Sequence, residues 1–273
     1  MRRDFFDLKE GFYIVTGGMG LLGRKHCEAI ALYGGTPVIL DSNLEGFAGF
    51  STEIEKNFKI KPVSIKTDIT KEESVRNALN YLKNNNKPIN ALINNAARNP
   101  GVSNKGLKSS NRLEEFSLNE WQLDLDVSLK GSFLCTKYFG NYMHENGNGV
   151  IINISSDLGI IAPNQTLYED KKLNSESQKV KPVTYSVVKA GIIGLTKYTA
   201  TYWPKTVRCN CICPGGIKTD QNQIFLEKIQ KLIPMQRMAN VNEYQGILIF
   251  LLSNASSYMT GSIISIDGGR TVW

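Results

Sequence analysis

The chain has 273 residues, of which 41% are hydrophobic, enough to bury the core of one ordinary α/β domain. The apolar residues fall in short runs, which excludes a transmembrane helix, and the basic N-terminus lacks the apolar segment of a signal peptide, so we expect a cytoplasmic location. The formal net charge of +7 comes from scattered Lys and Arg residues. This scatter argues against a nucleic-acid partner and fits an anionic substrate or cofactor.

Short apolar runs alternate with helix-like segments along the whole chain, with no internal repeat and no linker. The runs predict strands at residues 12–15, 37–40, 63–66, 91–93, 150–154, 207–212 and 263–266. Helices are predicted at residues 22–33, 44–57, 71–84, 118–144, 183–203, 221–232 and 241–252. This alternation predicts one α/β domain spanning residues 1–273, a Rossmann fold whose doubly wound, mostly parallel seven-stranded sheet has helices on both faces.

The first predicted strand runs directly into a glycine-rich turn. Gly18, Gly20 and Gly23 have the G-x-G-x-x-G spacing, and a predicted helix follows. Such a turn aims backbone N–H groups and a helix N-terminus at a phosphate. Asp41 ends the second predicted strand, where an acidic side chain meets the adenosine ribose, and the next two residues carry no positive charge. These residues predict a dinucleotide site that prefers NAD to NADP.

Three of the five cysteines, Cys209, Cys211 and Cys213, alternate along a predicted strand and would therefore point to one face. The chain has only two histidines to complete a metal site. We interpret the three cysteines as small buried side chains of a core strand and expect no metal site.

Tyr185 and Lys189 are four residues apart in a predicted helix, so their side chains share one helical face. An ammonium beside a phenol favours the phenolate, and we expect Lys189 to lower the pKa of Tyr185 below about 10. A phenol tuned in this way is a general acid or base.

Two polar segments, at residues 98–111 and 163–182, interrupt the alternation of strands and helices. The second leads straight into Tyr185, so we expect it to be an inserted substrate loop.

With these features the sequence resembles the short-chain dehydrogenases/reductases over nearly its whole length. The family's motifs occur in chain order. They are the glycine turn from Thr16 to Gly23, the adenine-side Asp68, the element Asn94-Asn95-Ala96-Ala97, the strand-end Ser156, the Tyr185/Lys189 pair, the segment from Pro214 to Thr219, and the C-terminal Thr260-Gly261 and Asp267-Gly268-Gly269.

The resemblance implies hydride transfer between a nicotinamide and a carbonyl or secondary alcohol. Tyr185 would exchange a proton with the substrate oxygen, Ser156 would hold that oxygen, and Lys189 would bind the nicotinamide ribose. Ser128 stands where relatives often carry a catalytic Asn, so the proton relay either survives through water or is weakened. The residues implied in cofactor binding are Gly17, Gly20, Leu22, Gly23, Asp41, Asp68, Ile69, Asn95, Tyr185, Lys189, Ile217 and Thr219.

The inserted segment between Ser156 and Tyr185 loosely resembles bacterial enzymes of sugar metabolism for surface polysaccharide or flagellin glycosylation, including legionaminic-acid-type pathways. A polar or anionic sugar substrate is therefore expected. Two alternatives remain open. The first is a 3-oxoacyl or other small-ketone reductase, which calls for an apolar or carrier-binding mouth. The second is a catalytically silent nucleotide-binding or regulatory protein, which only the departure at Ser128 supports.

The predicted helices at residues 118–144 and 183–203 carry more apolar and aromatic residues than one sheet face needs. Relatives pair these two helices across a two-fold axis and often add a second interface near the C-terminus. Closed symmetric assemblies are the usual form of soluble oligomers. We therefore expect a homotetramer, or otherwise a homodimer.

Overall fold

The computed structural model of the chain describes residues 5–8, 10–85, 87–98, 111–170 and 172–273. Within these residues, seven parallel strands form one sheet in the order β3-β2-β1-β4-β5-β6-β7. The chain order reverses between β1 and β4, and this creates a crevice at the carboxyl ends of the strands. The strands are β1 (Phe12–Thr16), β2 (Thr36–Asp41), β3 (Val63–Lys66), β4 (Ile89–Asn94), β5 (Gly149–Ile154), β6 (Val207–Pro214) and β7 (Ile263–Ile266).

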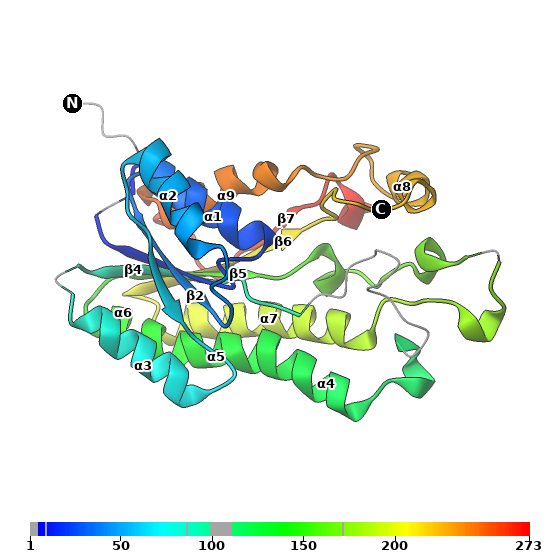
Figure 1. Cartoon of the computed structure of the whole chain (residues 1–273), viewed down its shortest axis with the longest axis horizontal. Helices are drawn as coiled ribbons and strands as arrows, with labels where there is room; N and C mark the ends of the chain where they lie inside the picture. The colour runs from blue at the N-terminus through cyan, green and yellow to red at the C-terminus, as the bar shows by residue number, and fades with distance from the viewer. Residues whose placement is uncertain (1–4, 9, 86, 99–110, 171) are drawn as a thin grey trace.

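Helices cover both faces of the sheet (Figure 1). One face carries α1 (Leu21–Leu32), α2 (Phe47–Phe58) and α9 (Gln245–Leu252). The other carries α3 (Glu72–Lys83), α7 (Val183–Tyr202) and a continuous helical stretch at residues 118–145. That stretch consists of α4 (Leu118–Leu125), α5 (Gly131–Cys135) and α6 (Asn141–Glu145), joined by the π-helical segments Asp126–Lys130 and Thr136–Gly140. The predicted fold class is confirmed.

The core is built on strands that are buried on both faces. Every residue of β1 and of β5 is buried, as expected for a parallel sheet between two helix layers. Alternate residues of β1 point to opposite faces: Val15 packs in the cluster under α1 and α9, and Ile14 in the cluster under α3. The cysteines of β6, Cys209, Cys211 and Cys213, are buried as free thiols. Of the helices that the structure describes, none has the length and apolar character needed to span a membrane.

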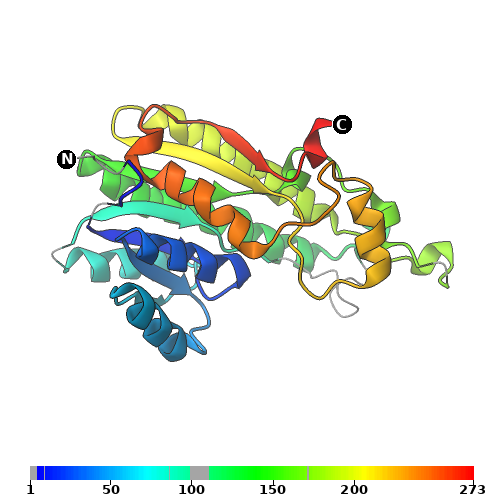
Figure 2. The ribbon, with the colours of Figure 1, turned by 90° about the horizontal axis from the view of Figure 1, so that it is seen from above.

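Residues 163–170 and 172–182 form, with α8 (Gln223–Gln230), a small cap beyond the carboxyl ends of the strands (Figure 2). Leu167 of this segment packs against Phe225 and Ile229 of α8, and the Lys228 ammonium donates to two carbonyls of the segment. The segment contains two short 3-10 helices, Gln165–Tyr168 and Ser175–Ser177. Of the other polar segment predicted to interrupt the fold, residues 99–110 lie outside the described residues.

Candidate active site

In the glycine turn after β1, two glycines lie so close to neighbouring backbone atoms that no side chain would fit on them. Gly17 has a φ of 63°, and a Cβ on this residue would lie 2.9 Å from the Cα of Ala96. A Cβ on Gly23 would lie 2.1 Å from the carbonyl oxygen of Gly17, so the first turn of α1 packs directly under the loop. Helix α1 starts immediately after Gly20. The N-terminus of α1 thus suits a phosphate group, whereas the N–H groups of Gly17, Met19 and Gly20 donate within the protein.

Asp41 and Asn95 flank this turn from the neighbouring strands. The Asp41 carboxylate ends β2 and accepts backbone N–H bonds from Met19 at 3.0 Å and Asn43 at 3.1 Å. Asn95, after β4, uses its amide to donate to the carbonyls of Thr16 and Gly17, at 2.9 and 3.2 Å. Asp41 is therefore held beside the turn, whereas the Asn95 side chain braces the turn itself.

A cavity of about 920 Å³ runs from the glycine turn to Tyr185 along the strand ends. Most residues predicted for the site line it: Gly17, Gly20, Leu22, Asp41, Asn95, Ser156, Tyr185, Lys189, Ile217 and Thr219. The structure places the other four away from the lining. Gly23 lies under the turn, Ile69 packs against Gly131 of α5, and Ser128 is buried in a π-helical segment. Asp68 hydrogen bonds to Thr70, and these bonds hold the pKa of its carboxyl below the usual value.

Ser156, Tyr185 and Lys189 meet at one end of this cavity. Ser156 follows β5, while the other two lie on the first two turns of α7. The Lys189 ammonium donates to the carbonyl of Ile154 at 3.0 Å and lies 5.8 Å from the centre of the Tyr185 ring. Burial lowers the pKa of Lys189 to about 8. A serine hydroxyl, a phenol and an ammonium thus face one cavity, which is the set of groups needed for proton transfer at a substrate oxygen.

The expected pKa of Tyr185 is wrong in direction. Burial raises the pKa of Tyr185 to about 12, and its hydrogen bond with Ser156, which favours the phenolate, offsets this only in part. The nearby Asp157 carboxylate raises the pKa of Tyr185 further. In this structure Tyr185 is therefore a neutral phenol at physiological pH, ready to donate a proton.

A buried ion pair next to Ser156 was not predicted from the sequence. The Asp157 carboxylate accepts the Ser156 hydroxyl at 2.8 Å and, through its other oxygen, the guanidinium of Arg270 at 2.7 Å. The Asp157 and Arg270 side chains are only 4% and 7% exposed. The sequence offers one signal for this pair, which is the carboxylate directly after the strand-end serine. Its partner Arg270 could not be identified from the sequence, because it lies 113 residues away.

Lys181 is a second group that sequence reasoning missed. It lies at the end of the inserted segment, lines the same cavity, and holds its ammonium 3.9 Å from the centre of the Tyr185 ring. Ser128 lies in the π-helical segment before α5. Its carbonyl accepts the Ser132 hydroxyl at 2.7 Å, and its buried hydroxyl oxygen has no hydrogen-bond partner among the described residues.

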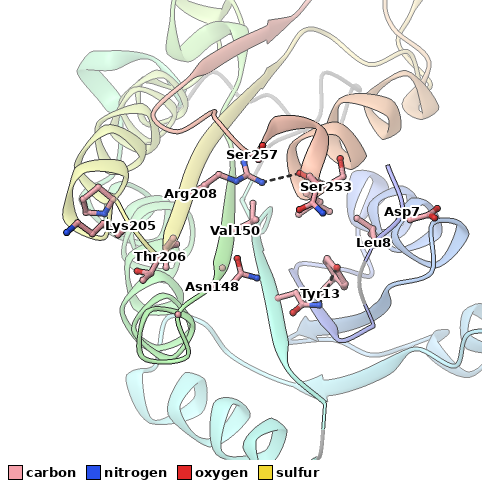
Figure 3. Close-up of a pocket in the computed structure, with 17 residues that line it drawn as sticks. Asp7, Leu8, Tyr13, Asn148, Val150, Lys205, Thr206, Arg208, Ser253 and Ser257 are labelled. Carbon is pink, nitrogen blue, oxygen red and sulfur yellow. Dashed lines mark hydrogen bonds between the residues drawn. The ribbon is translucent and has the colours of Figure 1, made fainter. Parts of the chain in front are cut away.

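A smaller cavity, of about 260 Å³, lies at the opposite end of the sheet, where β5 and β6 begin (Figure 3). Two basic residues, Lys205 and Arg208, are among its described lining, and the Arg208 guanidinium donates to the carbonyls of Leu251, Ser253 and Met259. These bonds satisfy one carbonyl in the last turn of α9 and two after it, and they bind the helix to β6. The arginine of this cavity therefore has a structural task, and we assign the cavity no ligand.

Three features together are typical of an oxidoreductase that uses a dinucleotide. They are the crevice where the strand order reverses, the glycine turn, and the cluster of Ser156, Tyr185 and Lys189. Residues 12–170 match the family model described as short chain dehydrogenase, and residues 174–271 match that described as enoyl-(acyl carrier protein) reductase. The chain belongs to the short-chain dehydrogenase/reductase family, which confirms the resemblance. It is therefore an oxidoreductase of the class that transfers hydride to or from a nicotinamide dinucleotide.

Relatives of the chain have several different activities. A 3-oxoacyl-[acyl-carrier-protein] reductase from Aquifex aeolicus is 30% identical and matches 94% of this chain and 95% of its own. Post-translational flagellin modification protein A from Campylobacter coli is 29% identical and matches 96% of this chain and 98% of its own. A solved structure of a putative gluconate dehydrogenase from Agrobacterium tumefaciens superposes with a TM-score of 0.85 at 26% identity, covering 98% and 99%. Other relatives are named as an NADP-dependent mannitol and an NAD-dependent glycerol dehydrogenase.

Proposed function

We propose that the protein is an NAD(H)-dependent oxidoreductase that interconverts a carbonyl and a secondary alcohol, with Tyr185 as the acid and base. The observation that carries this proposal is that Ser156, Tyr185 and Lys189 line the same cavity as the glycine turn and Asp41. The nicotinamide, when bound, supplies or accepts the hydride. The residues of this chain fit the dinucleotide because Gly17 and Gly23 leave no room for a side chain at the phosphate turn.

The protein's part in the reaction is to position the substrate oxygen and to move one proton. In carbonyl reduction, the neutral phenol of Tyr185 donates its proton to the substrate oxygen, and in alcohol oxidation the phenolate takes it back. Ser156 donates its hydroxyl to Asp157 in this structure, and by turning the hydroxyl to the substrate it would hold that oxygen beside Tyr185. Lys189, as an ammonium, would bind the nicotinamide ribose. The Ser128 hydroxyl lies away from the cavity lining, so a relay that returns a proton to Tyr185 would have to pass through water.

Replacement of Tyr185 by Phe tests this role, because it removes the hydroxyl and keeps the ring. Turnover should fall by about 10²–10⁴-fold with little change in the dissociation constant of the cofactor. Tyr81, an exposed tyrosine on α3, provides the matched control as Tyr81→Phe, which should keep full activity. Wild-type turnover in Tyr185→Phe would show that the proton moves through another group.

The preference for NAD rests on Asp41. Its carboxylate is held at the end of β2 beside the turn, where it would accept the ribose hydroxyls and repel a 2′-phosphate. Relatives include both NAD- and NADP-dependent dehydrogenases, so the preference belongs to this residue and not to the family. Fluorescence titration with NADH and NADPH tests it: Asp41→Asn should narrow the preference for NADH, and tighter wild-type binding of NADPH would refute the proposal.

We propose a polar substrate of the sugar or polyol type. The supporting observations are the polar inserted segment, which brings Lys181 into the cavity, and the relatives named for mannitol, glycerol and gluconate. A 3-oxoacyl reductase is the second candidate, supported by the Aquifex relative. Steady-state assays with sugars, polyols and sugar acids against a 3-oxoacyl panel separate the two. Cofactor binding without turnover on any panel would instead indicate a silent regulatory protein.

We further propose that the chain forms a cytoplasmic, single-domain homotetramer, or otherwise a homodimer. Among the apolar side chains of the two long helices, Phe139 and Ile192 are buried, but Phe133, Tyr198 and Tyr202 are 51%, 65% and 60% exposed. A second subunit packed on these helices would cover the exposed rings. Light scattering at micromolar concentration tests the assembly, and a mass near the 30.4 kDa of one chain would refute it.

A further inference from the structure

The C-terminal segment brings one cation to the strand-end serine. Arg270 lies in a short 3-10 turn after β7, is 6% exposed and lines the large cavity. The Asp267 carboxylate fixes this turn, because it accepts the N–H groups of Gly269 at 3.0 Å and Thr271 at 2.8 Å. The backbone of Arg270 is therefore held on both sides, which determines where its guanidinium enters the cavity.

Three donors share the carboxylate of Asp157. One oxygen accepts the Arg270 guanidinium at 2.7 Å, and the other accepts the Ser156 hydroxyl and the N–H of Leu158, both at 2.8 Å. If the serine turns away, the carboxylate keeps two donors, one of which is a cation. The loss is then small, whereas a buried carboxylate without a cation depends on every donor that remains.

The Ser156 hydroxyl has a single proton, which it gives either to Asp157 or to a substrate oxygen. In this structure it donates to Asp157, while its oxygen accepts the N–H of Leu158 at 3.2 Å and is hydrogen bonded to Tyr185. The carboxylate would therefore compete with a substrate for one proton. How strongly Asp157 attracts that proton depends on how much of its charge the Arg270 guanidinium neutralises.

We propose that Arg270 is a positioning residue for the reaction: it pairs with Asp157 and so weakens the hold of the carboxylate on the Ser156 hydroxyl, which can then turn to the substrate oxygen. The inference rests on the proposed function, in which Ser156 holds that oxygen. Hydrogen bonds to a charged group are about twice as strong as those between neutral groups. Loss of the cation should therefore lower kcat/KM by about tenfold.

A double-mutant cycle with Ser156 separates this role from a structural one. Initial rates with NAD and D-gluconate, mannitol or glycerol, and with NADH and acetoacetyl-CoA, identify a compound that the wild type turns over. On that compound Arg270→Gln, which keeps an N–H donor but removes the charge, should lower kcat/KM by about tenfold. In a Ser156→Ala background it should change kcat/KM by about twofold at most, because no hydroxyl is left to release. Arg270→Lys should keep most of the activity, and so should Arg76→Met, which removes an exposed arginine of α3.

An equal loss of kcat/KM in the Ser156→Ala background would overturn the inference, as would wild-type kcat/KM in Arg270→Gln. Melting temperatures show whether each variant is folded under the assay conditions. Should Arg270→Gln unfold, the double variant Asp157→Asn with Arg270→Met, which leaves no buried charge at this place, takes over the test. It should have kcat/KM close to that of the wild type, and a loss as large as that of Ser156→Ala would refute the role of the pair.

Atomic-resolution crystal structures of the NADH complexes give a readout that needs no turnover. The distance from the Ser156 hydroxyl oxygen to the Asp157 carboxylate should shorten from 2.8 Å in the wild type to about 2.5–2.7 Å in Arg270→Gln, the range for a hydroxyl bonded to a charged oxygen. An unchanged distance would contradict the inference. Failure of the proposed function looks different: the wild type turns over no compound of the panel, while the shortening in Arg270→Gln is still observed.

Discussion

Replacement of Lys189 by Met separates the stability cost of this side chain from its catalytic role. Lys189 is 6% exposed, and burial lowers the pKa of its ammonium from 10.5 to about 8. At 1.36 kcal/mol per pH unit, this fall corresponds to about 3 kcal/mol by which the charged lysine destabilises the fold near neutral pH. The variant removes that cost but also leaves the Ile154 carbonyl without its donor, which offsets part of the gain by about 1–3 kcal/mol.

The pH dependence of the unfolding free energy separates the cost of the buried charge from the loss of the hydrogen bond to Ile154. Below pH 8 the lysine is protonated in both the folded and the unfolded chain, so the cost is fully present. Between pH 8 and 10.5 the unfolded chain binds the proton and the folded chain does not, so wild-type stability rises with pH relative to Lys189→Met. The difference in unfolding free energy should therefore move by about 3 kcal/mol in favour of the wild type, with most of the change complete by pH 10.

Urea unfolding of both proteins at pH 7 and pH 10, monitored by tryptophan fluorescence, measures this difference. Lys197→Met is the matched control, because Lys197 is an exposed lysine on the same helix, and its stability relative to the wild type should not change with pH. Lys189→Met should also lose turnover and bind cofactor more weakly. A stability difference for Lys189→Met that is the same at both pH values would show that the buried ammonium does not carry the cost assigned to it.

Three further substitutions test other parts of the site. Arg270→Met leaves the carboxylate of Asp157 buried without its ion-pair partner and should destabilise the fold by about 3–5 kcal/mol; thermal unfolding measures this, and combination with Asp157→Asn should recover part of the loss. Gly23→Ala places a Cβ 2.1 Å from a backbone oxygen of the glycine turn and should weaken NADH binding, whereas Gly49→Ala, with open space around it, should not. Ser128→Ala should lower turnover with an unchanged melting temperature, because its hydroxyl has no hydrogen-bond partner among the described residues; wild-type turnover would exclude it from the relay.

Most of the fold could be predicted from the sequence because its information is local. A strand buried on both faces needs an unbroken apolar run, and each such run appears in the structure as a strand with ends shifted by at most two residues. Helix ends were less accurate. The helix predicted from residue 44 begins at Phe47, because Gly46 has a φ of 74° and cannot continue it. The crevice and most of its predicted lining follow from strand order, since parallel strands bring their carboxyl ends together.

Only the tertiary structure decided the electrostatics of the site. The spacing of Tyr185 and Lys189 predicted their shared face, but the pKa of the tyrosine depends on how much water the fold removes, and its direction came out reversed. The ion pair of Asp157 with Arg270 joins groups 113 residues apart, and the approach of Lys181 to Tyr185 depends on the path of the insertion. Hydrophobic periodicity is read within a few residues, whereas charge interactions and desolvation depend on neighbours that only folding brings together.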